Sequence, residues 1–470
     1  MKKLLIALIF LTAMAATSTT IKAQEVKITL SPGWTWISHP GTDTLEFATA
    51  FGSYIPAEGD IIESQYGIVE CYDGEWFGDF ELFYPGYGYM YYSNRTEPIV
   101  LTFNAQPASQ VVVTTLEPTD ITSVSAVVGG TVTIGEGNHI FACGVCWDTE
   151  PNPNIDVNHI ASNAVAGSQS ITLEGLFSGT TYYVRAYAVT DFGLVYGQEL
   201  SFSTLPEGAI NGRFTINANG DQVYFSQGNL QYIGSAATPY WKFAENQWDC
   251  LGTMTGQNSS DQNVDRDLFG WGTSGWDPGN TCYHPWDTYN STGSSYGPTG
   301  SNNLYGTYAN SDWGVYNPIS NGGNQPNQWR TPTTNEWEYV FNTRTTVSGI
   351  RYAKANVNEW NGVILLPDDW SASYYSLNNT NTDDASYSSN TITASEWNTM
   401  EQHGAVFLPT TGYRFGTSVK SVGNNGYYWS SSFVNGTYAY GVYFFDSNLN
   451  PQDCNNRSYG RGVRLVHDVE

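Results

Sequence analysis

Residues 173–188, LEGLFSGTTYYVRAYA, decide the architecture of the middle of the chain. Gly175 and Gly179 mark a turn, and a run in which large and small side chains alternate follows it. Alternation with a period of two predicts a β-strand whose two faces differ. We expect one face to carry Val184, Ala186 and Ala188, and the other to carry Tyr183, Arg185 and Tyr187.

The composition extends this prediction to the whole chain. Charged residues make up only 13% of the 470 residues, whereas Gly (48), Tyr (33) and Trp (16) are abundant. Such a composition favours turn-rich β structure over helical bundles. The length suits about three domains. We therefore predict a mainly β, multidomain protein in which helix is the minority state.

Changes in composition along the chain divide it into three expected domains. Residues 25–104 open with the alternating GWTWIS at 33–38 and close with the aromatic YGYMYY at 87–92, which predicts a small β domain. The linker-like AQPAS at 105–109 leads to a second β domain over residues 110–204. After Pro206-Glu207-Gly208, a third domain takes residues 210–467.

The first 23 residues have the features of a secretory signal peptide. Lys2 and Lys3 precede an apolar run from Leu4 to Ala16, and small residues lead to Ala23. We expect residues 1–23 to be removed and the protein to be exported to the cell surface, the medium or the periplasm. No later stretch has the roughly 20 apolar residues of a membrane span, so none is expected.

The charge excludes several classes of partner. The formal net charge is -26, and removal of Lys2, Lys3 and Lys22 with the signal makes it -29. Binding to nucleic acid depends on clustered Lys and Arg, and anionic membrane surfaces attract the same side chains. We therefore expect no nucleic-acid partner, whereas a neutral or cationic ligand is compatible with the chain.

The stretch at 173–188 resembles the end of a fibronectin type III domain, where a tyrosine locks the corner between two strands. The resemblance covers residues 110–204, although the usual early Trp is missing and Trp147 lies in a later strand. It implies a spacer, and we assign no site to it. Residues 25–104 resemble, in GWTWIS and in PGYGYMY at 85–91, an accessory module of secreted multidomain bacterial proteins.

Local signals in the third domain predict a hairpin and two helices. Residues 213–216 and 222–225 flank Asn219-Gly220, a strong hairpin signal. Thr333 with Glu336, and Thr393 with Glu396, form capping boxes at which helices begin. We expect Trp337, Val340 and Phe341 to lie inward on the first helix, Trp397 and Met400 on the second, and Gly404 to end the second. Short helices among many strands predict an α+β domain.

WRTPTTNEWEY at 329–339 resembles a signature of the C-type-lectin-like fold of formylglycine-generating enzymes and their relatives. GYYWSSS at 426–432 and YGRGVRLV at 459–466 look like the closing strands of that fold. The resemblance covers residues 213–467 and implies a C-type-lectin-like domain. In its bacterial major-paralogous and variable-protein branches, the stretch between these landmarks displays ligand-contacting residues. The fold serves enzymes, receptors and adhesins, so function depends on the site.

The catalytic branches of that family need residues that this chain lacks. Formylglycine-generating enzymes use a closely spaced C-terminal cysteine pair, and only Cys454 lies in that region. The related iron-dependent enzymes need a histidine cluster, whereas the six histidines are scattered singly. Asp368-Asp369 follows an apolar strand, in which neighbouring side chains point apart, so the pair indicates a turn at a strand end. We therefore expect no enzymatic activity.

The cysteines suggest structural roles. Six cysteines in an exported protein allow 15 disulfide connectivities, of which a pair between Cys250 and Cys282 is our preference. Cys143 and Cys146 have the spacing of a redox pair, but a strand would place the two thiols on opposite faces. We interpret them as packed core thiols.

Aromatic and amide side chains on loops and closing strands are the candidate binding residues. Rigid aromatic rings provide contact area at small entropic cost, and Asn both donates and accepts hydrogen bonds. If the closing strand alternates strictly, Tyr440 and Tyr443 point to opposite sides, so only one of them can face a ligand. The predicted ligand-binding residues are Tyr438, Tyr440, Tyr443, Asn448, Asn450, Asn455, Asn456, Trp313 and Tyr316.

One loop has the spacing of a calcium site. Asp261, Asn263, Asp265 and Asp267 place oxygen ligands at alternate positions. The loop lacks the glycine at the sixth place and the acidic residue at the twelfth, which are Arg266 and Gly272. A solvated loop is therefore the favoured interpretation, and no other cofactor is expected.

Together these features predict an exported, adhesin-like binding protein, not an enzyme, whose third domain recognises a glycan or an extracellular protein. Two alternatives remain open. One is an enzyme on the same fold, either glycan-active or an oxidoreductase. The other is a purely structural component of the envelope.

Overall fold

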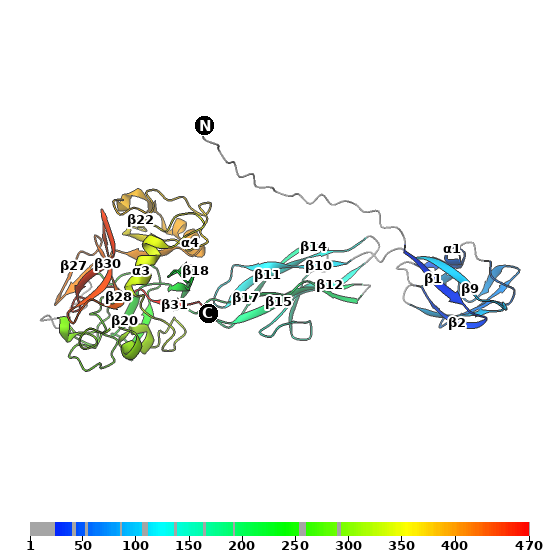
Figure 1. The fold of residues 1–470 in the computed structure, drawn as a ribbon, viewed down its shortest axis with the longest axis horizontal. Coiled ribbons are helices and arrows are strands. Elements are labelled where there is room, and N and C mark those ends of the chain that lie inside the picture. The colour runs from blue at the N-terminus through cyan, green and yellow to red at the C-terminus, as the bar shows by residue number, and fades with distance from the viewer. Residues whose placement is uncertain are drawn as a thin grey trace, which may run out of the picture.

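A computed structural model describes residues 24–469 except 40–43, 52–54, 85–86, 106–110, 136–138, 163–165, 191–192, 253–259 and 289–292. The expected signal peptide, residues 1–23, lies outside the described residues. The chain is mainly β and is built from many small sheets, as the composition predicted. No sheet combines strands from more than one of the groups β1–β9, β10–β17 and β18–β31. Figure 1 shows these groups as three bodies, which we call the first, second and third units.

The first unit contains one five-stranded antiparallel sheet and two short strand pairs. The sheet has the order β2 (Gly33–Ser38), β8 (Gly88–Ser93), β4 (Ile61–Ser64), β5 (Gly67–Tyr72) and β6 (Glu75–Gly78). The pairs are β1 (Gln24–Leu30) with β9 (Ile99–Ala105), and β3 (Leu45–Glu46) with β7 (Leu82–Phe83). The short helix α1 (Phe47–Phe51) places Phe47 and Phe51 in an aromatic core.

The second unit has the strand arrangement of a fibronectin type III-like sandwich. One sheet has the order β10 (Val112–Thr119), β11 (Ser125–Thr133) and β14 (Gly167–Glu174). The other runs β13 (Asn158–Ser162), β12 (Ile140–Asp148), β15 (Thr181–Thr190) and β16 (Gly193–Tyr196), and β17 (Leu200–Ser203) also pairs with β15. Val184, Ala186 and Ala188 are buried, while Tyr183 and Arg185 are half-buried, so the alternation predicted for β15 is confirmed. Tyr187 is buried too, on the other face.

The corner between β14 and β15 is held by Tyr182. Its side chain is buried, and its hydroxyl accepts a hydrogen bond of 2.9 Å from the backbone N–H of Phe177. This is the tyrosine corner that the resemblance implied. Its ring also stacks on Phe202 of β17, with 5.7 Å between ring centroids.

Replacing Tyr182 with phenylalanine should destabilise the second unit by about 1–2 kcal/mol, because the Phe177 N–H then loses its acceptor while the ring contacts remain. Hydrogen exchange of the β15 and β17 amides in the full chain measures this loss. Tyr183→Phe is the matched control, since Tyr183 lies on the opposite face, and it should change stability by less than about 0.5 kcal/mol. Equal effects of the two variants would show that the hydroxyl of Tyr182 has no special role.

Both cysteines of the 143–146 segment are buried in β12. Cys143 packs in the apolar cluster between the sheets, whereas the Cys146 thiol donates to the carbonyls of Pro153 and Arg185. Burial raises the pKa of Cys146 to about 11. A thiol with a raised pKa is a poor nucleophile, which agrees with packed core thiols.

The third unit begins and ends in one sheet. The predicted hairpin is formed by β18 (Ala209–Thr215) and β19 (Gln222–Ser226), and β19 also pairs with β31 (Val466–Asp468) at the end of the chain. A four-stranded sheet has the order β24 (Thr391–Ile392), β22 (Tyr352–Val357), β23 (Trp360–Leu365) and β25 (Val406–Pro409). The closing sheet is β28 (Gly426–Phe433), β29 (Tyr438–Phe445) and β30 (Asn448–Asn456). The hairpins β20 (Leu230–Ile233) with β21 (Tyr240–Phe243), and β26 (Tyr413–Phe415) with β27 (Ser418–Lys420), complete the unit.

Both predicted helices are confirmed, with complete capping boxes. Thr333 caps α3 (Thr334–Glu338), which continues as a π-helical turn over Tyr339–Thr343, and Thr393 caps α4 (Ala394–Gln402). Gly404 follows α4 at φ +85°, a conformation that suits the residue after a helix. The remaining helical segments are short: α2 (Trp313–Tyr316) and 3-10 turns at Gly293–Ser295, Gly306–Ser311 and Tyr387–Ser389. None of the helices described here has the length and apolarity to cross a membrane.

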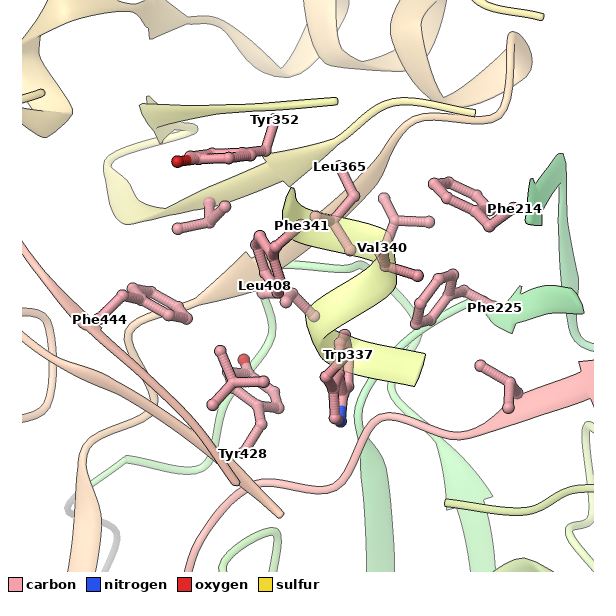
Figure 2. Packing of buried hydrophobic residues seen from close by; sticks show 14 of the residues in the cluster. Phe214, Phe225, Trp337, Val340, Phe341, Tyr352, Leu365, Leu408, Tyr428 and Phe444 are labelled. Carbon is pink, nitrogen blue, oxygen red and sulfur yellow. The ribbon is translucent and has the colours of Figure 1, made fainter. Parts of the chain in front are cut away.

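The helix α3 fills the centre of the third unit. Its Trp337, with Val340 and Phe341 from the turn that follows, packs among side chains from the surrounding sheets (Figure 2). The cluster draws on β18, β19, β22, β23, β25, β28, β29, β30 and β31. The third unit therefore has a core to which its first and last strands both contribute.

The expected disulfide between Cys250 and Cys282 is wrong. Cys250 and Cys282 both lie among the described residues, and neither forms a disulfide. Cys250 donates to the carbonyl of Trp248, and Cys282 is buried beside Tyr296. The two residues share a glycine-rich segment of sequence, but different neighbours surround each thiol.

Candidate functional site

Six aromatic side chains form a continuous strip on the third unit, which we call the ring strip. Neighbouring rings are in contact, with centroids 4.7 to 5.7 Å apart. Phe415 is exposed and the other five are half-buried. In order, the strip consists of Phe415, Tyr459, Tyr413, Tyr427, Tyr443 and Phe445.

One half of the strip is placed by the β26 hairpin. Tyr413 and Phe415 flank Arg414, so the strand alternation turns both rings outward and the guanidinium inward. Arg414 is buried, and its Nη2 donates to the carbonyl of Asp287 at 3.1 Å. Its backbone exchanges two hydrogen bonds with Gly460, at 2.7 and 2.8 Å. That bridge brings Tyr459 next to Tyr413, with 5.7 Å between their centroids.

The other half lies on the closing sheet. Tyr427 of β28 is directly opposite Tyr443 of β29, and their rings stack with centroids 4.7 Å apart and an interplanar angle of 21°. The Nδ2 of Asn425 donates to both hydroxyls, at 3.3 Å to Tyr427 and 3.1 Å to Tyr443. Because each ring covers a face of the other, the pair presents ring edges and hydroxyl groups outward.

Buried charges support the strip from below. The guanidinium of Arg461 lies 5.2 Å from the ring of Tyr427 and 4.6 Å from that of Trp429, and it donates to Asp453 at 3.0 Å. Burial raises the pKa of Tyr427 to about 12, so its hydroxyl keeps its proton at neutral pH. At the far end, the buried Lys354 donates to the Phe445 carbonyl at 2.8 Å and fixes the end of β29.

Burial along β29 does not alternate strictly, although its contacts do. Gly441 and Val442 are consecutive and both buried, and the register against β30 shifts between Gly441 and Tyr443. A Cβ at Gly441 would meet Nη1 of Arg461, whereas Val442 packs in the cluster around Trp337. Neighbouring residues of β29 thus face opposite sides, in agreement with the alternation that the sequence predicted.

The structure gathers most of the predicted binding residues onto one hairpin. Tyr438, Tyr440 and Tyr443 lie on β29, directly opposite Asn456, Cys454 and Asn450 of β30. Asn448 and Asn455 lie on the same strand as Asn450. The amide oxygens of Asn455 and Asn456 already accept hydrogen bonds from their own loop, including one from Ser458 to Asn456 at 3.0 Å.

The remaining predicted binding residues are on α2. Tyr316 is 41% exposed at the end of this helix. Trp313 is completely buried, with its ring 6.1 Å from that of Phe269, so its predicted contact with a ligand is corrected. Large aromatic residues beneath long loops more often fill the core than reach the surface.

The loop at 261–267 does not gather its oxygen atoms around a cation. Asp261 accepts from the backbone N–H of Asn263, and Asp265 accepts from that of Ser235. Asp267 is buried and accepts from Leu251. Within the described part of the chain, no three His, Cys, Asp or Glu side chains come close enough to hold a metal ion. The alternative of a calcium site at this loop therefore gains no support from the structure.

A hollow of about 1160 Å³ lies in the first unit. Aromatic side chains, among them Phe47, Phe51 and Trp76, line its floor, and Glu46, Glu75, Asp79 and Glu81 lie along it. These carboxylates are exposed, and Asp79 accepts from the backbone N–H of Ile68 at 3.0 Å. Its acidic side chains make the hollow negatively charged.

Of the six residues of the ring strip, only Tyr443 is among the binding residues predicted from the sequence. Tyr427 and Tyr459 lie inside the segments quoted for the C-type-lectin-like resemblance, and Tyr413 and Phe415 lie in a short Tyr-Arg-Phe sequence between them. The sequence did offer one signal, because two aromatic residues on either side of an arginine would share one face of a strand. The contact of this hairpin with Tyr459 depends on pairing between distant segments, which the sequence does not show.

Comparisons with known proteins give no family for the chain. A scan against protein-family models finds no match. A search of curated proteins finds none either. Solved structures do show similarity, but only over short parts of the chain.

Three of these structures illustrate the level of similarity. The sensor domain of the anti-sigma factor RsgI4 in Pseudobacteroides cellulosolvens is 22% identical, covers 21% of this chain and 96% of its own, and has a TM-score of 0.17. The sixth fibronectin type III domain of human fibronectin type III domain containing protein 3 is 20% identical, and the match covers 20% of this chain and 82% of that domain, with a TM-score of 0.16. Domains A168–A170 of titin are 13% identical, and the match covers 39% of this chain and 60% of the titin chain, with a TM-score of 0.17. Scores this low say nothing about what this protein binds.

Proposed function

We propose that this is an exported binding protein that holds a neutral glycan chain on the ring strip of its third unit. The observation that carries the proposal is the continuity of the strip, in which six side chains from four separate segments of the chain are in contact one after another. A contiguous, partly exposed aromatic surface of this kind marks an interaction site.

The chemistry of the strip fits a sugar chain. Sugar rings offer apolar C–H faces bordered by hydroxyl groups. The stacked pair of Tyr427 and Tyr443 offers ring edges together with two phenolic hydroxyls that Asn425 already orients. Tyrosine combines a large contact area with a polar group at low entropic cost. The exposed Asn450, opposite Tyr443, adds an amide beside the strip.

Charge favours a neutral ligand. The whole chain carries 44 acidic and 18 basic residues, so its net negative charge repels anionic polysaccharides before they reach the surface. The strip itself has no charged side chain, and the charge nearest its centre, Arg461, is buried and paired with Asp453. A neutral glycan would meet neither repulsion nor the cost of stripping water from an unpaired charge.

The C-type-lectin-like scaffold belongs to this proposal. Two features support it. The backbone of Arg330, in the first motif, exchanges two hydrogen bonds of 2.9 Å with Val466 of the closing motif. The Nε1 of Trp337 donates to the carbonyl of Trp429 at 3.4 Å. The segments on which the resemblance rests thus lie against one another, with the ring strip on the closing part.

Replacing Tyr443 with serine should weaken glycan binding roughly tenfold, because a ring contact of this kind contributes about 1–1.5 kcal/mol. The test is a glycan array with the full mature chain, followed by calorimetric titration of the best neutral ligand. Tyr305→Ser is the matched control, since Tyr305 is an exposed tyrosine outside the strip. Circular dichroism would establish that both variants are folded.

Two results would contradict the proposal. One is an array on which the folded wild-type chain binds no glycan. The other is glycan binding that Tyr443→Ser and Tyr305→Ser change equally. Binding of a protein in place of glycans, with the same dependence on Tyr443, would assign the strip to a different class of ligand.

A further inference from the structure

The five-stranded sheet of the first unit carries apolar side chains on both of its faces. Its inner face forms the core through residues such as Ile37, Ile62 and Val69, all at most 4% exposed. On the outer face, Trp36 is 75% exposed and Trp34 is 50% exposed. An antiparallel sheet usually has one packed and one polar, solvated face, so this outer face lacks the usual polar cover.

Strand register places these outward side chains side by side. Residues directly opposite each other on neighbouring strands share a face and are in contact range. The outer face therefore consists of one row of Trp34, Tyr92, Ile61, Glu70 and Phe77, and a second row of Trp36, Met90, Glu63 and Ile68. Within the first row, the rings of Trp34 and Tyr92 touch, with centroids 5.1 Å apart.

The side chains of the outer face indicate a polypeptide as its occupant. Ile68 and Phe77 are 49% and 54% exposed, and Ile61 and Met90 fill the centre of the two rows. Trp, Tyr, Phe and Met are the residues enriched where proteins meet. Aliphatic side chains in the middle of the face suit apolar side chains of another protein better than the hydroxyl groups of a sugar.

The charge on and around the outer face is negative. Glu63 and Glu70 lie within it, and neither row contains Lys or Arg. Between residues 24 and 105 the sequence has twelve acidic residues against Lys27 and Arg95. The Nη2 of Arg95 donates to the carbonyl of Ile55 at 2.7 Å. A partner with basic residues around its apolar contacts would complement this charge.

A second copy of this chain does not complement the negative charge of the outer face. The whole chain has 18 Lys and Arg against 44 Asp and Glu, so two copies repel each other. We propose that the outer face docks a different polypeptide, whose contacting surface is apolar and bordered by Lys or Arg side chains. This site is separate from the ring strip and does not depend on the function proposed for it.

The experiment uses the full mature chain and three synthetic peptides of equal length. One peptide alternates Lys with Leu, the second alternates Glu with Leu, and the third alternates Lys with Ser. Calorimetric titration should show binding of the Lys-Leu peptide alone, and Trp34→Ser/Trp36→Ser should weaken it at least about tenfold. Glu63→Gln/Glu70→Gln should weaken it severalfold and reduce its dependence on salt.

Matched variants separate the outer face from general attraction to an acidic chain. Phe177→Ser changes a side chain of the second unit that is 76% exposed, and Glu117→Gln/Glu150→Gln removes two exposed carboxylates of that unit. Neither should alter binding of the Lys-Leu peptide. Trp36→Phe keeps an aromatic ring and should retain most of the binding. Circular dichroism of Trp34→Ser/Trp36→Ser should match that of wild type, which excludes unfolding as the cause of a loss.

Four outcomes would overturn the proposal. The Lys-Leu peptide could bind wild type and Trp34→Ser/Trp36→Ser equally or not at all, or the Glu-Leu peptide could bind as well as the Lys-Leu peptide. Sedimentation could show self-association that the Trp double variant abolishes, which would make the occupant a second copy. Glycan binding that requires Trp34 and Trp36 would make the outer face a sugar platform.

Discussion

Replacing Asp368 with alanine should destabilise the third unit by about 3–5 kcal/mol, because it leaves a buried guanidinium without its counter-ion. The carboxylate of Asp368 accepts from Nη1 of Arg344 at 2.9 Å, and the Arg344 side chain has no exposed surface. Asp368 also accepts from the backbone and hydroxyl of Thr215 and from Gln222. One residue thus connects the first hairpin of the unit to the segment after α3.

The pKa of Arg344 shows how much the pair matters. Burial lowers it to about 10, and the attraction of Asp368 works against this shift. Without Asp368, the free-energy cost of burying the Arg344 guanidinium is no longer offset by a nearby negative charge. Three further hydrogen bonds, to the carbonyls of Val340, Arg351 and Leu366, would still hold the side chain in place.

The matched control is the neighbouring residue. Asp369 is exposed, so Asp369→Ala should change the free energy of unfolding by less than about 0.5 kcal/mol. Hydrogen exchange of the β18, β23 and α3 amides in the full chain reports on the third unit alone. In Asp368→Ala/Arg344→Met both charges are absent, and part of the lost stability should return. A double variant no more stable than Asp368→Ala would argue against stranded charge as the cause.

The parts of the fold that the sequence predicted are those fixed by local hydrogen bonds. The capping boxes at Thr333 and Thr393 and the corner at Tyr182 each need partners only three to five residues away. Asp368-Asp369 was interpreted as a strand end for a similarly local reason. Both residues do lie in a turn just after β23, with the carboxylate of Asp368 bonded to the buried Arg344 and that of Asp369 exposed.

The parts that the sequence did not predict depend on contacts between distant strands. Alternation did not predict that the consecutive residues Gly441 and Val442 would both be buried, beside a register shift against β30. Alternation in GWTWIS indicated two different faces, but it did not say that Trp34 and Trp36 would be the exposed ones. Burial of Trp313 likewise depends on residues far away in the sequence.

Replacing Trp337 with alanine should cost about 3–5 kcal/mol, because it opens a cavity at the centre of the third unit. Trp337 is completely buried, and its ring lies 5.6 Å from Phe225 and 6.1 Å from Phe341 (Figure 2). Trp337→Phe keeps most of these contacts and should cost clearly less. Asn335→Ala, at an exposed position of the same helix, is the control and should be nearly neutral.

The same variant separates stability from recognition. Trp337 donates to the carbonyl of Trp429, whose ring lies beneath Arg461, and Arg461 in turn lies beneath Tyr427 of the ring strip. At a temperature where Trp337→Ala remains folded, hydrogen exchange should rise in α3 and β28, while glycan affinity should change far less than in Tyr443→Ser. If affinity instead fell as much in Trp337→Ala as in Tyr443→Ser, recognition would depend on the rigidity of the whole core and not on ring contacts at the surface.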